Sequence, residues 1–145
     1  MRVLAALREL LEARVARAVR EIESLDLAAE GESHGSAGDK YETAREMFAQ
    51  SRGLQAGILR DAREGLEWIR LQDSSRGRES VSVGAVFLTH DGWHLACPFP
   101  GEFEAGADRI RAVSMASPLG QALKGARVGE RREFRGRVVE ILELE

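Results

Sequence analysis

The sequence predicts an α+β chain in which a long antiparallel α-helical coiled-coil hairpin precedes a small antiparallel sheet domain with one short helix. The first half, to about residue 72, contains no proline and repeats apolar residues at helical spacing. The second half holds all three prolines and shows strand-like runs separated by glycine turns. This change of pattern predicts a hairpin domain at residues 1–73 and a sheet domain at residues 76–145.

Two helical segments make up the first half. Apolar residues recur three or four positions apart from Leu4 to Leu25, and a glycine-containing break follows from Asp26 to Asp39. The second stripe consists of Ala44, Met47 or Phe48, Ser51, Leu54, Ile58, Ala62, Leu66 and Ile69. Neither narrow stripe is buried by its own helix. We therefore expect the two helices to pair as an antiparallel hairpin or, alternatively, to form two sides of a larger bundle.

The second half contains several predicted strands and one helix. The strands are expected at Val81–Thr89, Trp93–Cys97, Arg109–Met115, Arg131–Phe134 and Val138–Leu144. An Asp-Gly pair between the first two predicts a hairpin turn. Ser117 before Pro118 supplies a helix N-cap and a proline at the first helical position, and Gly125 follows where the helix would end. A short helix is therefore predicted from Pro118 to Lys124.

Composition excludes several classes of function. The chain has 145 residues, with 21 basic and 24 acidic side chains and a formal net charge of −3. Proteins that bind nucleic acid through their own surface are usually basic, so we expect any contact with nucleic acid to be indirect, through a partner. The single cysteine, Cys97, excludes an intrachain disulfide and fits a reducing, cytoplasmic compartment.

Nothing in the sequence predicts contact with a membrane. No run approaches the ~20 apolar residues of a membrane span, and charge interrupts the N-terminus too early for a signal peptide. His90, His94 and Cys97 have a spacing that would suit zinc, but Asp91-Gly92 turns the chain between the histidines and no fourth ligand is evident. We expect these three to be strand and turn residues.

Acidic residues gather at the expected tip of the hairpin, near residues 30–46. Asp39 and Glu42 are three positions apart at the start of the second helix, a spacing that places both carboxylates on one face. Two hard oxygen ligands suit Mg²⁺, but they bind it weakly without further ligands such as a phosphate or a partner's acids. The same residues also suit a helix N-terminus, as a cap and as partners of the helix dipole. The pair alone leaves both roles open.

A second motif lies in the sheet domain. Ser117-Pro118-Leu119-Gly120, followed by Ala122-Leu123, Gly125 and Val128-Gly129-Glu130, resembles the C-terminal motif of the bacterial GreA/GreB transcript-cleavage factors. The order of a coiled-coil hairpin and then an FKBP-like domain is similar to that family over nearly all of the chain. The resemblance implies an FKBP-like domain that docks on RNA polymerase, with Ser117, Pro118, Leu119 and Gly120 as a mainly structural part of it.

The resemblance also implies a role for the tip. Asp39 and Glu42 fall on the family's Asp and Glu, which help hold the second Mg²⁺ at the polymerase active site and stimulate the polymerase's own cleavage of backtracked RNA. The expected protein is therefore an accessory transcription elongation factor and not an enzyme. Its coiled coil would enter the secondary channel of RNA polymerase, with no cofactor in isolation and Mg²⁺ shared only in the complex.

Two tip positions depart from the family pattern. Thr43 replaces the family's Asn, and Arg45 replaces an acidic residue. These departures are typical of a divergent Gre-like branch, and they leave open a non-cleaving secondary-channel regulator or a plain coiled-coil interaction module. Arg45 and Arg52 are candidate contacts with polymerase or the RNA 3′ segment. The oligomeric state is also left open, because a long apolar stripe can pair between chains.

Overall fold

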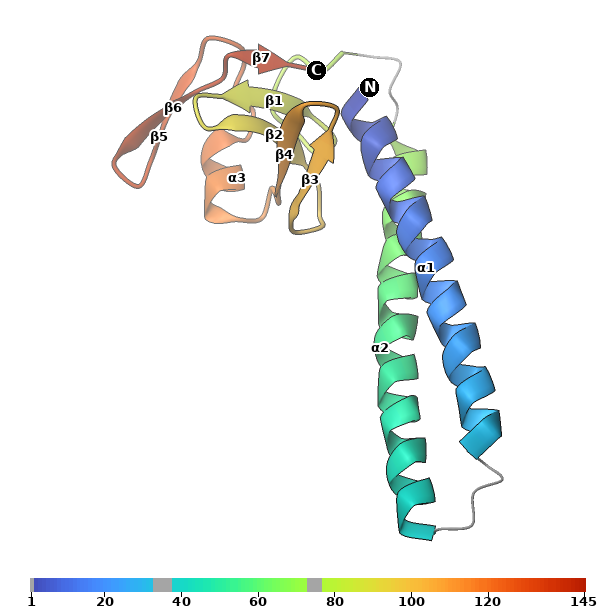
Figure 1. The fold of residues 1–145 in the computed structure, drawn as a ribbon. Coiled ribbons are helices and arrows are strands. Elements are labelled where there is room, and N and C mark those ends of the chain that lie inside the picture. The colour runs from blue at the N-terminus through green and yellow to red at the C-terminus, as the bar shows by residue number, and fades with distance from the viewer. Residues whose placement is uncertain (1, 33–37, 73–76) are drawn as a thin grey trace. The chain divides into compact units, whose positions relative to one another are not determined.

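The computed structural model describes residues 2–32, 38–72 and 77–145, with no description of the side chains of residues 32, 38 and 39 (Figure 1). The chain divides into two compact units, Arg8–Ile69 and Met1–Leu7 with Arg70–Glu145. Two long helices are followed by a small sheet domain with one short helix. The predicted fold class is therefore confirmed.

The hairpin is built from α1, Arg2–Glu32, and α2, Gly38–Leu71. The predicted break after Asp26 is wrong, because α1 continues to Glu32 through a run of good helix formers that includes Leu27 and two alanines. Asp26, late in α1, accepts a hydrogen bond of 2.8 Å at Oδ1 from Nε of Arg52, which lies in the first half of α2. Gly65, late in α2, lies against Leu11, early in α1, because a Cβ placed on Gly65 would lie 2.6 Å from Leu11 Cδ1. These two contacts make the helices antiparallel.

The inward stripe of α1 follows the sequence prediction. Leu7, Leu11 and Ala18 are buried, and Val15, Ile22 and Leu25 are half-buried at the same spacing. Opposite them, Gly65 is buried and its missing side chain leaves room for Leu11. Because glycine costs helix stability, its presence here indicates a place where the two helices approach closely.

The stripe predicted for α2 is wrong at Ser51, Leu54 and Ile58, which are exposed, whereas the predicted Ala44, Phe48, Ala62, Leu66 and Ile69 are buried or half-buried. The inward residues are Phe48, Gln55, Leu59, Ala62, Leu66 and Ile69, all buried or half-buried. Leu54 remains 66% exposed and Ile58 38% exposed, one residue out of phase with this set. The observed residues from Gln55 to Ile69 follow the alternating four- and three-residue spacing of a heptad, with the polar Gln55 at one of its inward positions. The sequence prediction chose the apolar neighbours instead.

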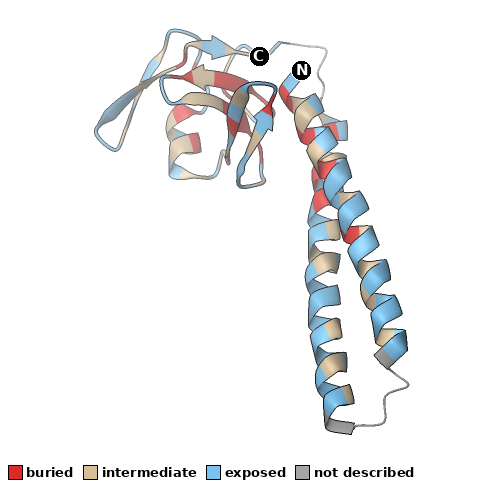
Figure 2. Cartoon of the chain, viewed as in Figure 1, coloured by how far each residue is buried: buried red, intermediate tan, exposed pale blue. Residues whose placement is uncertain are grey.

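Burial along the hairpin is graded. Figure 2 shows the buried residues of the two long helices confined to one half of the hairpin. The buried apolar residues of the two helices are Val3, Leu7, Leu11, Ala18, Ala62 and Ile69. Among the described residues from Val19 to Asp61, none is fully buried. The half of the hairpin near its tip therefore has less packing to resist local opening than its base, the half that contains residues 3–18 and 62–69.

The sheet domain contains seven strands in two sheets. The strands are β1 Val86–Thr89, β2 Gly92–Ala96, β3 Glu102–Ala105, β4 Asp108–Val113, β5 Arg131–Phe134, β6 Arg137–Glu140 and β7 Glu143–Leu144. The larger sheet has the order β3-β4-β2-β1-β7, and β5 pairs with β6 alone. One detail differs from expectation: β2 and β4 are parallel, so the sheet is mixed.

Two predicted strands have clearly different bounds, and one observed strand was not predicted. The first predicted strand is shorter, because residues before β1 form a turn at Gly84, whose φ is 86°. The last predicted strand is split between β6 and β7, because the fully buried Ile141 leaves the small sheet and its N–H bonds to the Glu130 carbonyl at 3.1 Å. The edge strand β3 was not expected.

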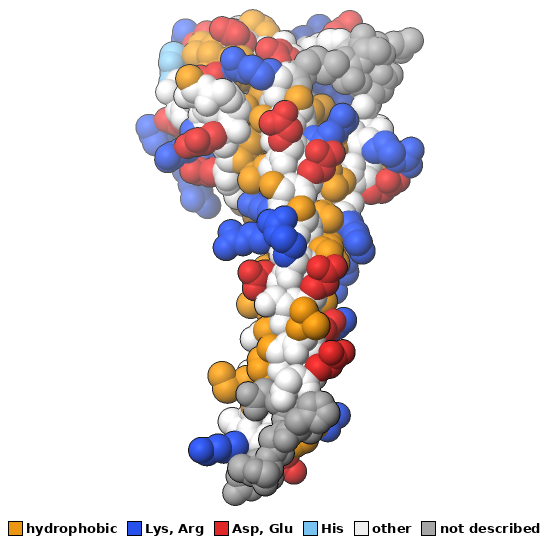
Figure 3. Space-filling model, turned by 45° about the vertical axis from the view of Figure 1, so that its right-hand side comes forward, with side chains coloured by type: hydrophobic (Ala, Val, Ile, Leu, Met, Phe, Trp, Pro, Cys, Tyr) orange, Lys and Arg blue, Asp and Glu red, His pale blue; other side chains and the backbone are white. Residues whose placement is uncertain are grey.

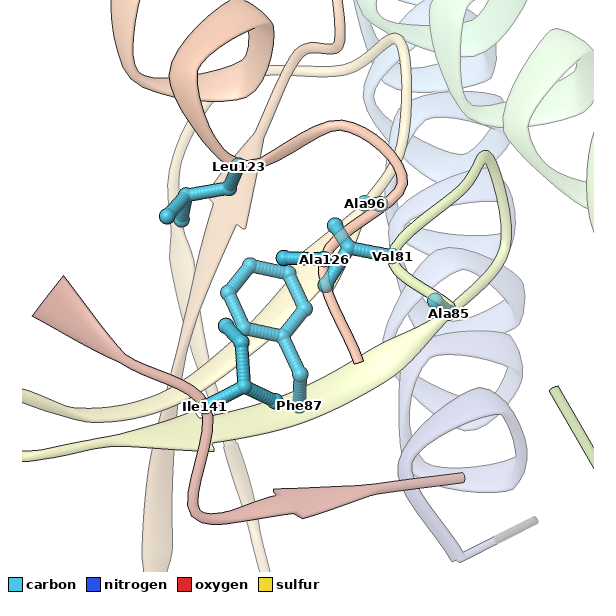
Figure 4. Close-up of a cluster of buried hydrophobic side chains, with 7 residues drawn as sticks. All are labelled: Val81, Ala85, Phe87, Ala96, Leu123, Ala126 and Ile141. Atoms are coloured by element: carbon cyan, nitrogen blue, oxygen red, sulfur yellow. The ribbon is translucent and has the colours of Figure 1, made fainter. Parts of the chain in front are cut away.

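The core of the sheet domain lies between α3, Pro118–Leu123, and the larger sheet (Figure 4). Its buried members are Val81, Ala85, Phe87, Ala96, Leu123, Ala126 and Ile141. Val81 N–H donates to the Ala126 carbonyl at 2.8 Å, and Gly125 N–H donates to the Val81 carbonyl at 2.8 Å. These bonds hold the segment after α3 against the segment before β1, which closes the core.

His94 is the one described residue with a buried side-chain nitrogen or oxygen that has no hydrogen-bond partner, at its Nδ1. The side chain is 3% exposed and stacks on Phe87 with ring centroids 5.0 Å apart. Burial lowers the pKa of His94 because it disfavours the charged imidazolium, and nearby Arg111 lowers it further. The Gly92 backbone and Asp91 oppose this shift. The folded protein therefore favours neutral His94.

This shift predicts acid sensitivity of the fold. Because the folded pKa lies below the ordinary value of 6.5, only the unfolded chain gains a proton as the pH first falls below 6.5. The free energy of unfolding should fall in that range and level off below the folded pKa. Urea unfolding between about pH 7.5 and about pH 5.5 measures this dependence.

A matched pair of variants isolates the cause. His94→Leu should flatten the pH dependence, whereas the exposed His90→Gln should keep it. An unchanged slope in His94→Leu would contradict the assignment.

Candidate functional site

The turn that leads into α3 is organised by Ser117. This residue is the helix N-cap, with φ −70° and ψ 159°. Its Oγ accepts a hydrogen bond from Gly120 N–H at 3.1 Å and donates to the Ser114 carbonyl at 2.6 Å. Pro118 follows at the start of the helix, where a backbone N–H is not needed. The Ser117 hydroxyl therefore serves the helix start.

Gly120 marks the closest approach in this turn. A Cβ placed on it would lie 2.0 Å from the Ser114 carbonyl oxygen and 2.7 Å from Met115 Cα. Both atoms belong to the backbone, so the overlap cannot be relieved by turning a side chain. Leu119 packs against the buried core beside Leu123. The four residues Ser117 to Gly120 thus fix how α3 leaves the sheet and covers the core.

A second surface of this domain was missed by the sequence analysis. The β5–β6 hairpin and the turn before it carry five arginines between residues 127 and 137. Arg131 pairs with Glu140 at 3.0 Å, and Arg132 pairs with Glu130 at 2.9 Å, which lowers the pKa of the Glu130 carboxyl. Arg135 lies over the Phe134 ring, 5.1 Å from its centroid. The sequence signal for this surface is the local cluster of arginines, which the nearly balanced net charge of the whole chain does not reveal.

At the tip, α2 begins at Gly38, so Asp39 and Glu42 both lie in its first turns. Glu42 and Lys40 are exposed. The side chain of Asp39 lies outside the part that the structure describes. The helical backbone keeps the spacing that places residues 39 and 42 on one face. Within the described ranges, no group of three or more His, Cys, Asp or Glu side chains is placed to hold a metal ion.

The two tip arginines have different surroundings. Arg52 donates to both carboxylate oxygens of Asp26, at 2.8 Å and 3.5 Å, and this hydrogen bond raises the pKa of Arg52. Since both partners are exposed, the pair adds little stability. Arg45 is exposed one turn beyond Glu42. Arg52 therefore has a partner inside the chain, and Arg45 lies closer to the candidate carboxylates.

His90, His94 and Cys97 are not gathered into a group that could hold a metal ion in the described part of the chain. His94 and Cys97 are buried in the sheet domain, whereas His90 is exposed. The Cys97 thiol donates to the Phe99 carbonyl at 3.3 Å, and burial raises the pKa of this thiol. These residues are strand and turn residues, as expected. Among the described residues, neither long helix has a stretch apolar enough to cross a membrane.

Comparisons with known proteins add one resemblance. No family model matches the chain, and no curated protein matches it either. Among solved structures, the chain is similar to one described as the transcription factor Gfh1, over 96% of this chain and 93% of that one. The sequence identity is 18% and the TM-score is 0.39. Similarity at this level assigns neither a family nor an activity, so the functional conclusion depends on the residues themselves.

The geometry at Gly120 predicts a large loss of stability on substitution. In Gly120→Ala the new methyl group would overlap the Ser114 carbonyl, and the backbone must move to admit it. We expect the free energy of unfolding of the sheet domain to fall by about 3 kcal/mol or more, measured by urea unfolding followed through tryptophan fluorescence.

Gly77→Ala is the matched control in the same unit, because a Cβ there meets nothing within 4 Å. Its effect should stay within about 0.5 kcal/mol. Equal effects of the two substitutions would contradict the packing argument.

Proposed function

We propose that this chain is a Gre-like accessory factor that binds RNA polymerase, in the cytoplasm, and is not itself an enzyme. The observation that carries the proposal is the Ser117-Pro118-Leu119-Gly120 motif, in which each residue has a defined part in starting α3 over the sheet. It occurs in a chain that begins with a long helical hairpin, the order expected of that family. The sheet domain would dock on the polymerase.

The hairpin has dimensions that suit insertion into a channel. The 34 residues of α2 span about 50 Å at 1.5 Å per residue. Two helices side by side form a rod that is narrow relative to this length. The tip side chains lie at the opposite end of α2 from Leu71, where that helix ends and the chain continues to the sheet domain. This geometry supports entry into the secondary channel of the polymerase.

At the end of the rod, Asp39 and Glu42 are proposed to complete the ligands of a Mg²⁺ ion at the polymerase active site. Two carboxylates bind this ion weakly alone, so polymerase carboxylates and an RNA phosphate must supply the remaining ligands. A second Mg²⁺ at a phosphodiester favours hydrolysis by activating water and stabilising the leaving oxygen. The chain's own residues thereby stimulate cleavage of backtracked RNA without forming an active site.

One specific feature favours a second candidate, a channel regulator that does not promote cleavage. Arg45 lies three residues after Glu42, on a neighbouring position of the helix surface. Its positive charge opposes the concentration of negative charge that would attract Mg²⁺. Thr43 directly follows Glu42, in place of the family's Asn. A tip altered in this way can occupy the channel while holding the ion poorly.

A transcript-cleavage assay on backtracked elongation complexes tests the proposal. The wild-type chain should accelerate 3′ cleavage by the cognate polymerase in the presence of Mg²⁺. Asp39→Ala and Glu42→Ala should each abolish the stimulation, because either loss leaves this chain with one tip carboxylate to offer the ion. Polymerase affinity should stay within about threefold of wild type, since one exposed side chain rarely dominates an interface.

Glu64→Ala, an exposed carboxylate on the shaft, is the control and should cleave normally. Binding to polymerase without stimulated cleavage would support the channel regulator. Normal cleavage by Asp39→Ala would refute the metal role, and absence of polymerase binding would refute the proposal as a whole.

A further inference from the structure

The tip-side half of α2 exposes an apolar stripe that α1 does not cover. Met47 is 63% exposed, Leu54 66% and Ile58 38%. With Ser51 they follow spacings of four, three and four residues, the a/d pattern of a coiled-coil seam. The stripe is about 17 Å long at 1.5 Å per residue. Figure 3 shows hydrophobic side chains at the surface along the hairpin, interrupted by charged ones.

This exposed stripe is a second seam on a helix that already has one. It is displaced from the inward set, Phe48, Gln55 and Leu59, by one residue, which is about 100° around the helix. A helix with two adjacent apolar seams is typical of bundles in which each helix packs against two neighbours. The hairpin supplies one neighbour, α1, for the inward seam, so a helix that covered the second seam would come from another chain.

The charges at the two ends of the stripe indicate which helix fits. Lys40 lies seven residues before Met47, and Asp61 lies seven residues after Leu54, so both continue the seam. Both are exposed, and Asp61 pairs with its sequence neighbour Arg60 at 3.5 Å, with both side chains about 70% exposed. The stripe is therefore apolar in the middle, positive at one end and negative at the other.

We propose that this stripe binds the same stripe of a second copy of the chain, with the two α2 helices antiparallel. Centred between Ser51 and Leu54, such a pair places Met47 against Ile58 of the second copy. Lys40 then lies about one helical turn from Asp61 of the second copy, and the two-fold axis repeats the contact. A parallel pair would instead place lysine beside lysine, which disfavours it.

The resulting assembly is a four-helix arrangement of two hairpins, and it is weak. Each copy contributes three apolar side chains and one Lys–Asp contact, far less than a standard interface. We therefore expect a dissociation constant on the order of tens of micromolar. The inference does not depend on the proposed function, because it rests on the surface of α2 alone.

Sedimentation equilibrium of the full chain, from about 5 µM to about 500 µM, tests the proposal. The wild type should pass from monomer to dimer. Leu54→Glu should weaken association by about tenfold or more, because it places two carboxylates in the seam. Leu27→Glu is the control: Leu27 is 69% exposed on α1, on the side away from α2, and its substitution should leave association unchanged.

A charge exchange tests the register without touching the apolar residues. Lys40→Glu alone should weaken the dimer, because it places an acid near Asp61 of the second copy. Adding Asp61→Lys should restore association to within about threefold of wild type. A monomer at every concentration, an equal effect of Leu27→Glu, or failure of the double variant to recover would overturn the proposal. So would a monomeric chain whose Leu54→Glu variant loses affinity for polymerase, since the stripe would then serve that partner.

Discussion

The hairpin depends on one constraint: in a pair of helices, each helix can bury only the single seam of residues that faces the other. α1 and α2 meet that constraint with a regular heptad set that includes the small Ala18, Ala62 and Gly65 at the base. Small residues let the helices approach closely there, and larger but less buried residues continue the seam toward the tip. The outward stripe of Met47, Leu54 and Ile58 follows from the same constraint, because a seam one residue out of phase cannot reach α1.

The sheet domain meets a different requirement, since its small core must be closed by one short helix. Phe87 and Ile141 occupy the middle of the core, and α3 covers them with Leu123 (Figure 4). The entry to α3 is fixed by backbone proximity at Gly120 and by the Ser117 cap. His94 lies on the same sheet, buried against Phe87 with an unpaired nitrogen. Substitutions at Gly120, at the Ser117 cap or in the core beneath α3 should therefore destabilise this domain.

Much of this architecture could be predicted from the sequence, and the failures have physical causes. The α1 seam and the cap-proline-glycine pattern of α3 depend on local periodicity and local chemistry, so they are visible in the sequence. The α2 seam was misplaced because apolarity favours Leu54 and Ile58, whereas the geometry of pairing selects Gln55 and Leu59. The parallel pairing of β2 with β4 depends on the long-range placement of strands. For the tip pair, Asp39 and Glu42, the sequence supplies the spacing, but in the proposed function the remaining ligands would come from the polymerase and its RNA.

Because burial along the hairpin is graded, the residues that maintain the fold are separate from the residues that can vary. Between Val19 and Asp61 no described residue is fully buried, so substitutions there change little of the packing that holds the chain together. Thr43 and Arg45 lie in this permissive stretch and are exposed. A chain built this way can exchange the chemistry at the end of its rod while the base and the sheet domain stay constant. Descendants of one scaffold can thus diverge in activity without an intermediate that fails to fold.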